Sequence, residues 1–162
     1  MQNSAASAAS IDRFNIRERL ERYCACLDNR DYDGVAACFT DDCEASFGSG
    51  TDDADPLVGG KAIAEWVRVL DNYRESIHAI SHVSVIFEGA EADVVSMLVA
   101  TLIGGTERCG RAYVRGIRYT DRMTRHEGGW VISRRRHQPL WQYEALSQVP
   151  SLPEPLRTAR PG

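Results

Sequence analysis

A carboxylate interrupts an apolar stripe near the start of the chain. Between Ile16 and Asp28, apolar side chains recur at i, i+4, i+7, i+8 and i+11, the spacing of one buried helical face. Asp28 lies one turn beyond Cys24 in the same row, where the pattern requires a hydrocarbon. Since an unpaired buried charge costs several kcal/mol, we expect this acid to be neutral, hydrogen-bonded, or facing a cavity with a cationic partner. Alternatively, residues 29–31 end the helix and Asp28 turns to solvent.

Two histidines share one face of a predicted strand. Alternation along Ile77–Phe87 places His78 and His82 on the same side. If that side packs on the first helix, one of them can meet Asp28. A carboxylate that orients an imidazole makes a general base that titrates near neutral pH. A histidine on a strand can also be structural, but two on one face beside a misplaced acid favour catalysis.

The elements that would position these groups form a helical block followed by a strand block. Helices are predicted at 16–28, 31–39 and 61–73, a short strand at 43–47 and a turn-rich loop at 48–55. Strands are predicted at 77–87, 92–103, 111–124 and 130–138. The short turns between these strands imply antiparallel neighbours. The order predicts an α+β fold in which helices pack on one face of a curved, mostly antiparallel sheet.

The chain's length and composition indicate one globular domain. It has 162 residues, of which 43% are hydrophobic and 26% charged. We predict the domain over 11–148, a flexible N-terminal tail over 1–10, and a proline-rich tail over 149–162 that stays mobile or reaches a neighbouring subunit.

Charge and cysteine content narrow the classes of partner. The net charge of −4 argues against nucleic acid, whose phosphates favour a basic protein surface. No window has the roughly 18 continuous apolar residues that a membrane span needs, and residues 1–10 lack the features of a signal peptide. The five cysteines have no paired spacing, so we expect reduced core thiols in a cytoplasmic protein, with no metal.

Four segments carry a resemblance to a known family. YCACLDNRDYDGVAACFTDDCEA (23–45), GGKAIAEWV (59–67), HAISHVSV (78–85) and YTDRMTRHEGGWVISRRR (119–136) resemble, in order and spacing, the SnoaL-like branch of the nuclear transport factor 2-like (NTF2-like) superfamily. The resemblance runs from about Ile11 to His137. Within this branch, the sequence is similar to scytalone dehydratase, bile-acid 7α-dehydratase and lindane dehydrochlorinase. It implies a cone-shaped α+β barrel with an Asp–His pair and no metal or organic cofactor.

The resemblance assigns roles to individual residues. It places the family's aspartate at Asp28, its general-base histidine at His78 and its tyrosine at Tyr23. His78, held by Asp28, would remove a proton from an activated carbon. The hydroxyl of Tyr23, with an ordinary pKa of about 10, is a poor base but suits donation to a carbonyl or a departing hydroxyl.

The resemblance also implies residues that contact substrate. A substrate-binding arginine near the end of the last strand matches Arg135 best, with Arg134 as the alternative. His82 stands where many relatives have asparagine, so it is either a second acid–base group or structural. We expect an apolar lining that suits a cyclic polyketide, steroid or aromatic substrate. The predicted lining residues are Leu27, Phe47, Trp66, Val67, Met97 and Tyr113.

Three functions remain open at this point. A dehydratase-type lyase is the first, an isomerase or cyclase using the same base is the second, and a non-catalytic ligand-binding module is the third. The presence of both Asp28 and His78 favours the two enzymes. The small subunit of ring-hydroxylating dioxygenases shares the fold, but no feature of this sequence requires a large partner.

The predicted sheet also suggests self-association. If helices cover one face, Val83, Val85 and Phe87 would lie on the other. Because large exposed apolar patches mark interfaces, we predict a homo-oligomer, with a trimer ahead of a dimer.

Overall fold

The computed structural model describes residues 2–48, 55–105, 110–127 and 129–148, with side chains from Ser7 onward. The elements in these ranges are α1 (Gln2–Asn29), α2 (Tyr32–Ala36), β1 (Phe39–Ser46), β2 (Leu57–Val58), α3 (Gly60–Trp66), the 3-10 helix η1 (Val67–Asn72), β3 (Glu75–Glu88), β4 (Glu91–Gly105), β5 (Gly110–His126) and β6 (Gly129–Ser147). Most of the predicted loop at 48–55, and the predicted tail at 149–162, lie outside the described residues.

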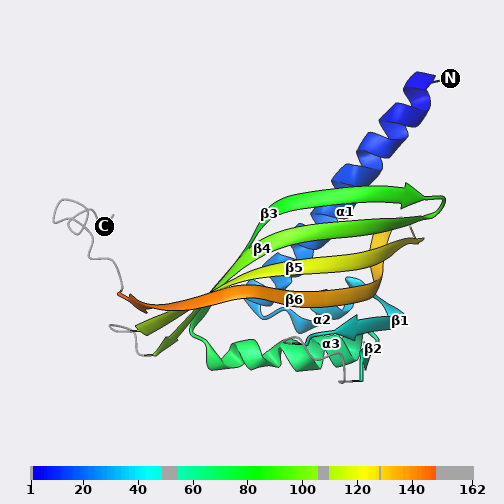
Figure 1. Cartoon of the computed structure of the whole chain (residues 1–162). Helices are drawn as coiled ribbons and strands as arrows, with labels where there is room; N and C mark the ends of the chain where they lie inside the picture. Colours follow the sequence, from blue (N-terminus) through cyan, green and yellow to red (C-terminus); the bar gives the residue numbers. More distant parts are fainter. Residues whose placement is uncertain (1, 49–54, 106–109, 128, 149–162) are drawn as a thin grey trace, which may run out of the picture.

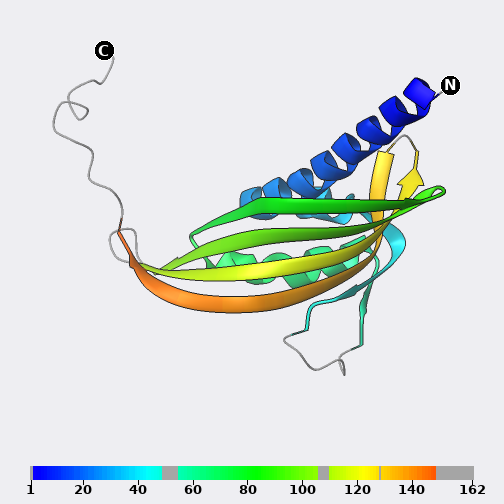
Figure 2. The same cartoon turned by 45° about the horizontal axis from the view of Figure 1, so that its top comes forward.

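The described strands form one curled, mixed sheet in the order β2-β1-β6-β5-β4-β3 (Figure 1). Strands β3 to β6 form an antiparallel meander, as the short turns predicted. Strand β1 pairs parallel to β6 and antiparallel to β2. Figure 2 shows the helices together on the concave side of the sheet. The α+β prediction is confirmed, whereas neither the short strand β2 nor the parallel pairing was predicted.

Helix α1 is anchored by its apolar stripe. Ile16, Leu20 and Leu27 are buried, as the spacing predicted. Arginines on its flanks hold it to the sheet, since Arg13 donates to the carbonyl of Val85 (2.8 Å) and Arg19 to that of Trp130 (2.7 Å). The helix begins at Gln2, within the segment predicted as a tail, and its first turns project beyond the sheet (Figure 1).

The short helices differ from their predicted ranges. Asp31 caps α2 by accepting a hydrogen bond from the backbone N–H of Gly34 (2.8 Å). The chain turns into β1 at Phe39, so the second helix is shorter than predicted and the strand begins earlier. The predicted third helix is α-helical only to Trp66 and continues as η1.

A β-bulge in β3 reverses the facing of half the strand. Ile80 pairs with Leu98 and His82 with Met97, so Ser81 is an extra residue in the ladder. His78 lies on the concave side, but the bulge turns His82 outward, where it is exposed. The prediction that both histidines share a face is therefore wrong, because strict alternation assumes an unbroken ladder.

The same bulge also changes which apolar residues of β3 face outward. Beyond Ser81, Val83, Val85 and Phe87 face inward and pack with the core. In β3 the large apolar residues that remain exposed are Ile77 and Ile86, each 64% exposed. The prediction of an outer patch at 83, 85 and 87 is therefore wrong.

The described cysteines belong to the core, as predicted. Cys24, Cys26, Cys38 and Cys43 are buried and free. Cys109 lies outside the described residues. Among the helices of the described ranges, none is long and apolar enough to cross a membrane.

Candidate functional site

A cavity of about 170 Å³ lies between the concave face of the sheet, α1 and the α3–η1 segment. Its floor comes from β3, β4 and β5, and His137 of β6 joins it. Helix α1 contributes Tyr23 and Leu27, and the turn after β1 contributes Phe47.

The acid in the apolar stripe meets the histidine of β3. Oδ1 of Asp28 lies 2.6 Å from Nδ1 of His78, and Oδ2 accepts the backbone N–H of His78 (2.8 Å). Ser76 donates its hydroxyl to Oδ1 (2.9 Å). The His78 side chain is 6% exposed and lines the cavity. Because Nδ1–H donates to the carboxylate, Nε2 keeps a lone pair for a ligand.

Hydrogen bonds to the Asp28 carboxylate lower its pKa by more than burial raises it. Burial alone would raise the pKa of Asp28, but the hydrogen bonds from the His78 ring and backbone, followed by that from Ser76, bring this pKa below its ordinary value. Asp28 is therefore ionised at neutral pH and holds the imidazole in one orientation.

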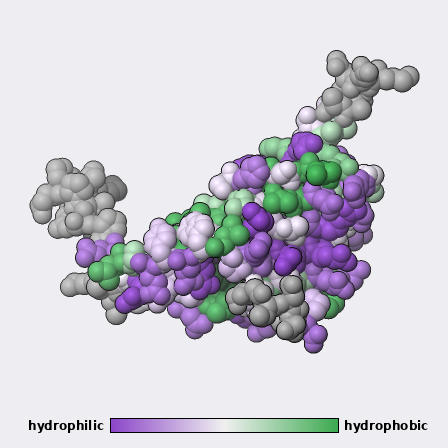
Figure 3. Space-filling model, viewed as in Figure 1, coloured by the Kyte–Doolittle hydropathy of each residue, from purple (hydrophilic) through white to green (hydrophobic). Residues whose placement is uncertain are grey.

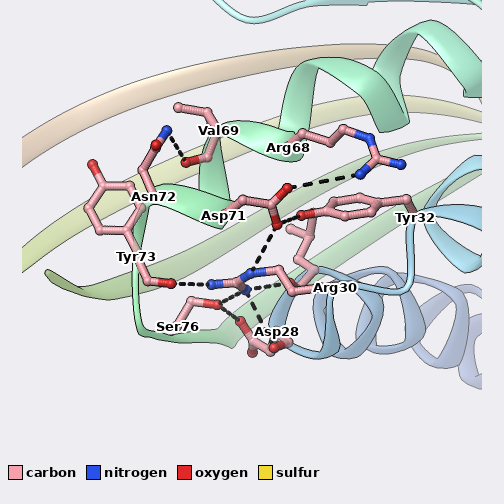
Figure 4. Close-up of polar contacts among 10 residues, drawn as sticks. Asp28, Arg30, Tyr32, Arg68, Val69, Asp71, Asn72, Tyr73 and Ser76 are labelled. Atoms are coloured by element: carbon pink, nitrogen blue, oxygen red, sulfur yellow. Dashed lines mark hydrogen bonds and ion pairs between the residues drawn. The ribbon is translucent and has the colours of Figure 1, made fainter. Parts of the chain in front are cut away.

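Arg30 forms hydrogen bonds with the residues that surround the Asp28–His78 pair (Figure 4). Its guanidinium donates to Ser76 Oγ (2.7 Å), to the carbonyl of Leu27 (2.8 Å) and to that of Tyr73 (3.1 Å). Since Ser76 Oγ accepts from Arg30, its own hydrogen is free to donate to Asp28. The network joins the end of α1 to η1 and to the start of β3.

Tyr23 is buried and lines the same cavity. Burial raises its pKa to about 12, although the positive charge of Arg135 opposes the shift. The hydroxyl therefore remains protonated at neutral pH, as a hydrogen-bond donor must. The ring is fixed by edge-on contacts with Phe39 and Tyr119, at centroid distances of 5.5 and 6.1 Å.

Arg135 lies behind the cavity wall. It forms a bidentate pair with Asp121, Nε–Oδ1 at 2.8 Å and Nη2–Oδ2 at 2.6 Å, and both side chains are 0% exposed. Its guanidinium stacks 4.4 Å from the ring centroid of Tyr23 and 4.0 Å from that of Tyr119. The prediction that Arg135 contacts substrate is corrected: its acid partner and the tyrosines enclose it. The alternative, Arg134, is 73% exposed and lies near Glu44 instead.

Most of the predicted apolar lining does border the cavity. Phe47 and Trp66 stack with centroids 4.2 Å apart, and Leu27 and Val67 lie on the adjoining walls. Trp66 is 43% exposed, which places it at the solvent side.

Two predicted lining residues lie elsewhere. Met97 alternates with Ser96 and Leu98, which are buried on the concave side, so it faces outward. Tyr113 packs edge-on against Tyr73 at 5.8 Å, and it is Tyr73 that reaches the cavity. Because the predicted strand at 92–103 was apolar on both faces, its inner face could not be chosen from the sequence.

Two polar residues in the cavity were missed. Arg115 of β5 and His137 of β6 line it, and Arg115 Nε and His137 Nδ1 are buried without a hydrogen-bond partner. Burial, together with the charges of Arg135 and Arg115, lowers the pKa of His137 to about 4, so its ring is neutral at pH 7. Alternation in β5, which puts Arg115 on the face of Ile117 and Tyr119, was the available signal.

In the ranges that the structure describes, no group of three or more His, Cys, Asp and Glu side chains is arranged to hold a metal ion.

The structure thus combines an α+β fold, a curled sheet and an Asp–His pair beside a cavity that aromatic and aliphatic side chains line. The chain belongs to the SnoaL-like domain family of the NTF2-like superfamily, whose family model matches residues 8–136. A search of curated protein sequences gave no significant match.

Solved structures share this fold. A candidate scytalone dehydratase from Novosphingobium aromaticivorans is 21% identical, with a TM-score of 0.74 over 85% of this chain and 90% of the other. A hexachlorocyclohexane dehydrochlorinase from Novosphingobium barchaimii is 16% identical, with a TM-score of 0.71 over 93% and 99%. A candidate aromatic ring hydroxylase from N. aromaticivorans is 26% identical, with a TM-score of 0.69 over 85% and 93%.

Proposed function

We propose that this protein is a cofactor-independent lyase that removes water from a small, largely apolar cyclic substrate. The observation that carries the proposal is the 2.6 Å contact between Asp28 and a His78 side chain that lines a cavity of mostly aromatic and aliphatic residues. The SnoaL-like scaffold and its dehydratase and dehydrochlorinase neighbours are consistent with lyase or isomerase chemistry.

His78 acts as the general base. Its Nε2 takes a proton from a carbon next to a carbonyl, and Asp28 stabilises the resulting imidazolium. The C–O bond to the β-hydroxyl then breaks, and the departing oxygen takes a proton from Tyr23. The products are water and a conjugated double bond, and proton transfer from the imidazolium back to the tyrosinate restores the enzyme.

The cavity contributes by excluding water. Tyr23 is buried and the His78 side chain is only 6% exposed, and low polarity strengthens the contacts that each makes with developing charge. General acid–base help in such a site is worth roughly 100- to 10,000-fold in rate.

An isomerase or cyclase is the second candidate. The same observation, a base and a protonated hydroxyl on one cavity, meets the needs of a double-bond shift, in which Tyr23 would polarise the carbonyl while His78 moves a proton. A non-catalytic module would bind the same ligands without changing them.

The test is a screen of β-hydroxylated cyclic ketones, with enone absorbance and mass spectrometry as readouts. We expect loss of water with at least one substrate, and His78→Ala should lower turnover at least about 100-fold while ligand affinity changes less than about ten-fold. His82→Ala, on the outer face, is the matched control and should change turnover less than about ten-fold. Isomerised products would select the second candidate. Tight binding of the whole panel without turnover would overturn the enzyme proposal.

A further inference from the structure

Arg115 faces the same part of the cavity as His78. His78 pairs with Ala100, and Ala100 pairs with Arg115, so the three residues form one row across β3, β4 and β5. All three line the cavity. Neighbouring strands lie about 4.8 Å apart, so the backbones of His78 and Arg115 are separated by about 10 Å. The small side chain of Ala100 leaves the space between them open.

Arg115 has no carboxylate partner among the described residues. Two acids that the fold brings to this part of the sheet have other partners, since Asp28 pairs with His78, and Glu144 of β6 pairs with Arg111. Arg115 Nε is buried and without a hydrogen-bond partner. The residue as a whole is half-buried, so its guanidinium is positioned to bind a negatively charged ligand that enters the cavity.

His137 adds a second unsatisfied group to the same cavity. Its Nδ1 is buried without a partner, and its ring lies between Phe47 and Tyr119, with centroids 5.5 and 5.6 Å away. A neutral imidazole can accept or donate a hydrogen bond, whereas a second cation would repel Arg115. The pair thus combines one positive charge with one neutral polar ring.

We propose that Arg115 binds a carboxylate carried by the substrate, and that His137 hydrogen-bonds the same group. A carboxylate matches the guanidinium fork and supplies the missing charge. Roughly 150 Å³ suffices for benzene, so a cavity of about 170 Å³ suits a single ring with a small substituent. The substrate class is therefore a monocyclic carboxylic acid. This inference rests on the proposed function for its reaction but not for its binding step.

The test compares a carboxylate with its neutral analogue. Benzoate and benzamide have the same ring and similar size, and their affinities at pH 7 can be measured by calorimetry. The wild type should bind benzoate at least about ten-fold more tightly than benzamide. Arg115→Gln should abolish this preference, and Arg115→Lys should keep part of it. Arg118→Gln, on the outer face of the same strand, is the matched control and should keep it fully.

The outcomes separate this inference from the proposed function. His78→Ala should still prefer benzoate, because the anchor and the base are different residues. Equal binding of benzoate and benzamide by the wild type, or an intact preference in a folded Arg115→Gln, overturns the carboxylate site. Turnover of neutral ketones alone would overturn it too, while leaving the lyase intact. A preference that depends on Arg115 supports the site, even if no substrate is turned over.

Discussion

Asp28 occupies a position where α1 otherwise buries hydrocarbon, and its partners explain how the fold tolerates a charge there. The carboxylate receives the His78 ring N–H, the His78 backbone N–H and the Ser76 hydroxyl. The same bonds that lower the pKa of Asp28 fix the imidazole. One set of hydrogen bonds therefore both stabilises the charge of Asp28 and orients the His78 ring.

The pair should behave as one unit in kinetics. Asp28→Asn should lower turnover nearly as much as His78→Ala, because the amide holds the wrong tautomer and cannot stabilise an imidazolium. The double variant should be no more than about ten-fold slower than the slower single one. Steady-state kinetics on the substrate found by the screen measures this, and multiplicative losses would show that the two residues act separately.

His137 should make stability depend on pH. Its folded pKa of about 4 lies below the ordinary value of 6.5, so between these values the unfolded chain binds the proton first. The stability held by the neutral ring is present above pH 6.5 and is lost as the pH falls towards 4. His137→Gln should therefore unfold with a shallower pH dependence from 6.5 to 4 in urea titrations. An NMR titration showing the His137 ring protonating near 6.5 would contradict this.

Among the elements, local patterns predicted the helices and the meander, and non-local contacts decided the rest. The stripe from Ile16 to Leu27 and the turns between strands are short-range signals, and both were correct. The bulge at Ser81 has no such signal, yet it turned His82 outward and Val83 inward. The parallel pairing of β1 with β6 joins distant segments and was equally hidden.

The residues of the candidate site also fall into those that local sequence patterns revealed and those that only the fold revealed. Asp28 was visible because a charge broke an apolar row, and His78 because it lies on the side of the bulge where simple alternation holds. Arg135 was misassigned because its partner Asp121 is on another strand, so the sequence showed an arginine without the acid that neutralises it. Arg115 was overlooked for the opposite reason, since what marks it is the lack of a partner in the fold.

The end of α1 depends on Arg30, and two substitutions separate its roles. Arg30 has φ 58°, a conformation that costs a non-glycine residue about 1 kcal/mol, while its side chain binds Ser76 and the carbonyl of Tyr73. Arg30→Ala should lose roughly 2 kcal/mol of unfolding free energy. Arg30→Gly should lose about 1 kcal/mol less, because glycine adopts positive φ freely. Urea unfolding measures both, and equal losses would mean that the backbone strain is negligible.

On the scale of the whole molecule, the sheet extends further than the helices that pack on it. The ends of β4, β5 and β6 run past the helical layer as an arm (Figures 1 and 2). Within β6 this arm carries Trp141, Tyr143 and Leu146, and Leu146 is 80% exposed. Figure 3 shows hydrophobic residues among polar ones at this end of the molecule. Such residues at the end of a long strand are typical of a surface that meets another protein.

We therefore keep the prediction of a homo-oligomer, with a trimer ahead of a dimer, and move its interface from 83–87 to this arm. Light scattering at micromolar concentration should give about three times the 18.0 kDa of one chain. Leu146→Asp should lower that mass, because a charge would be buried in the interface. Ile11→Asp places the same charge on an exposed residue of α1, at the other end of the molecule, and should leave the mass unchanged. A monomer mass for the wild type would refute the prediction, and an unchanged mass for Leu146→Asp would exclude the arm as the interface.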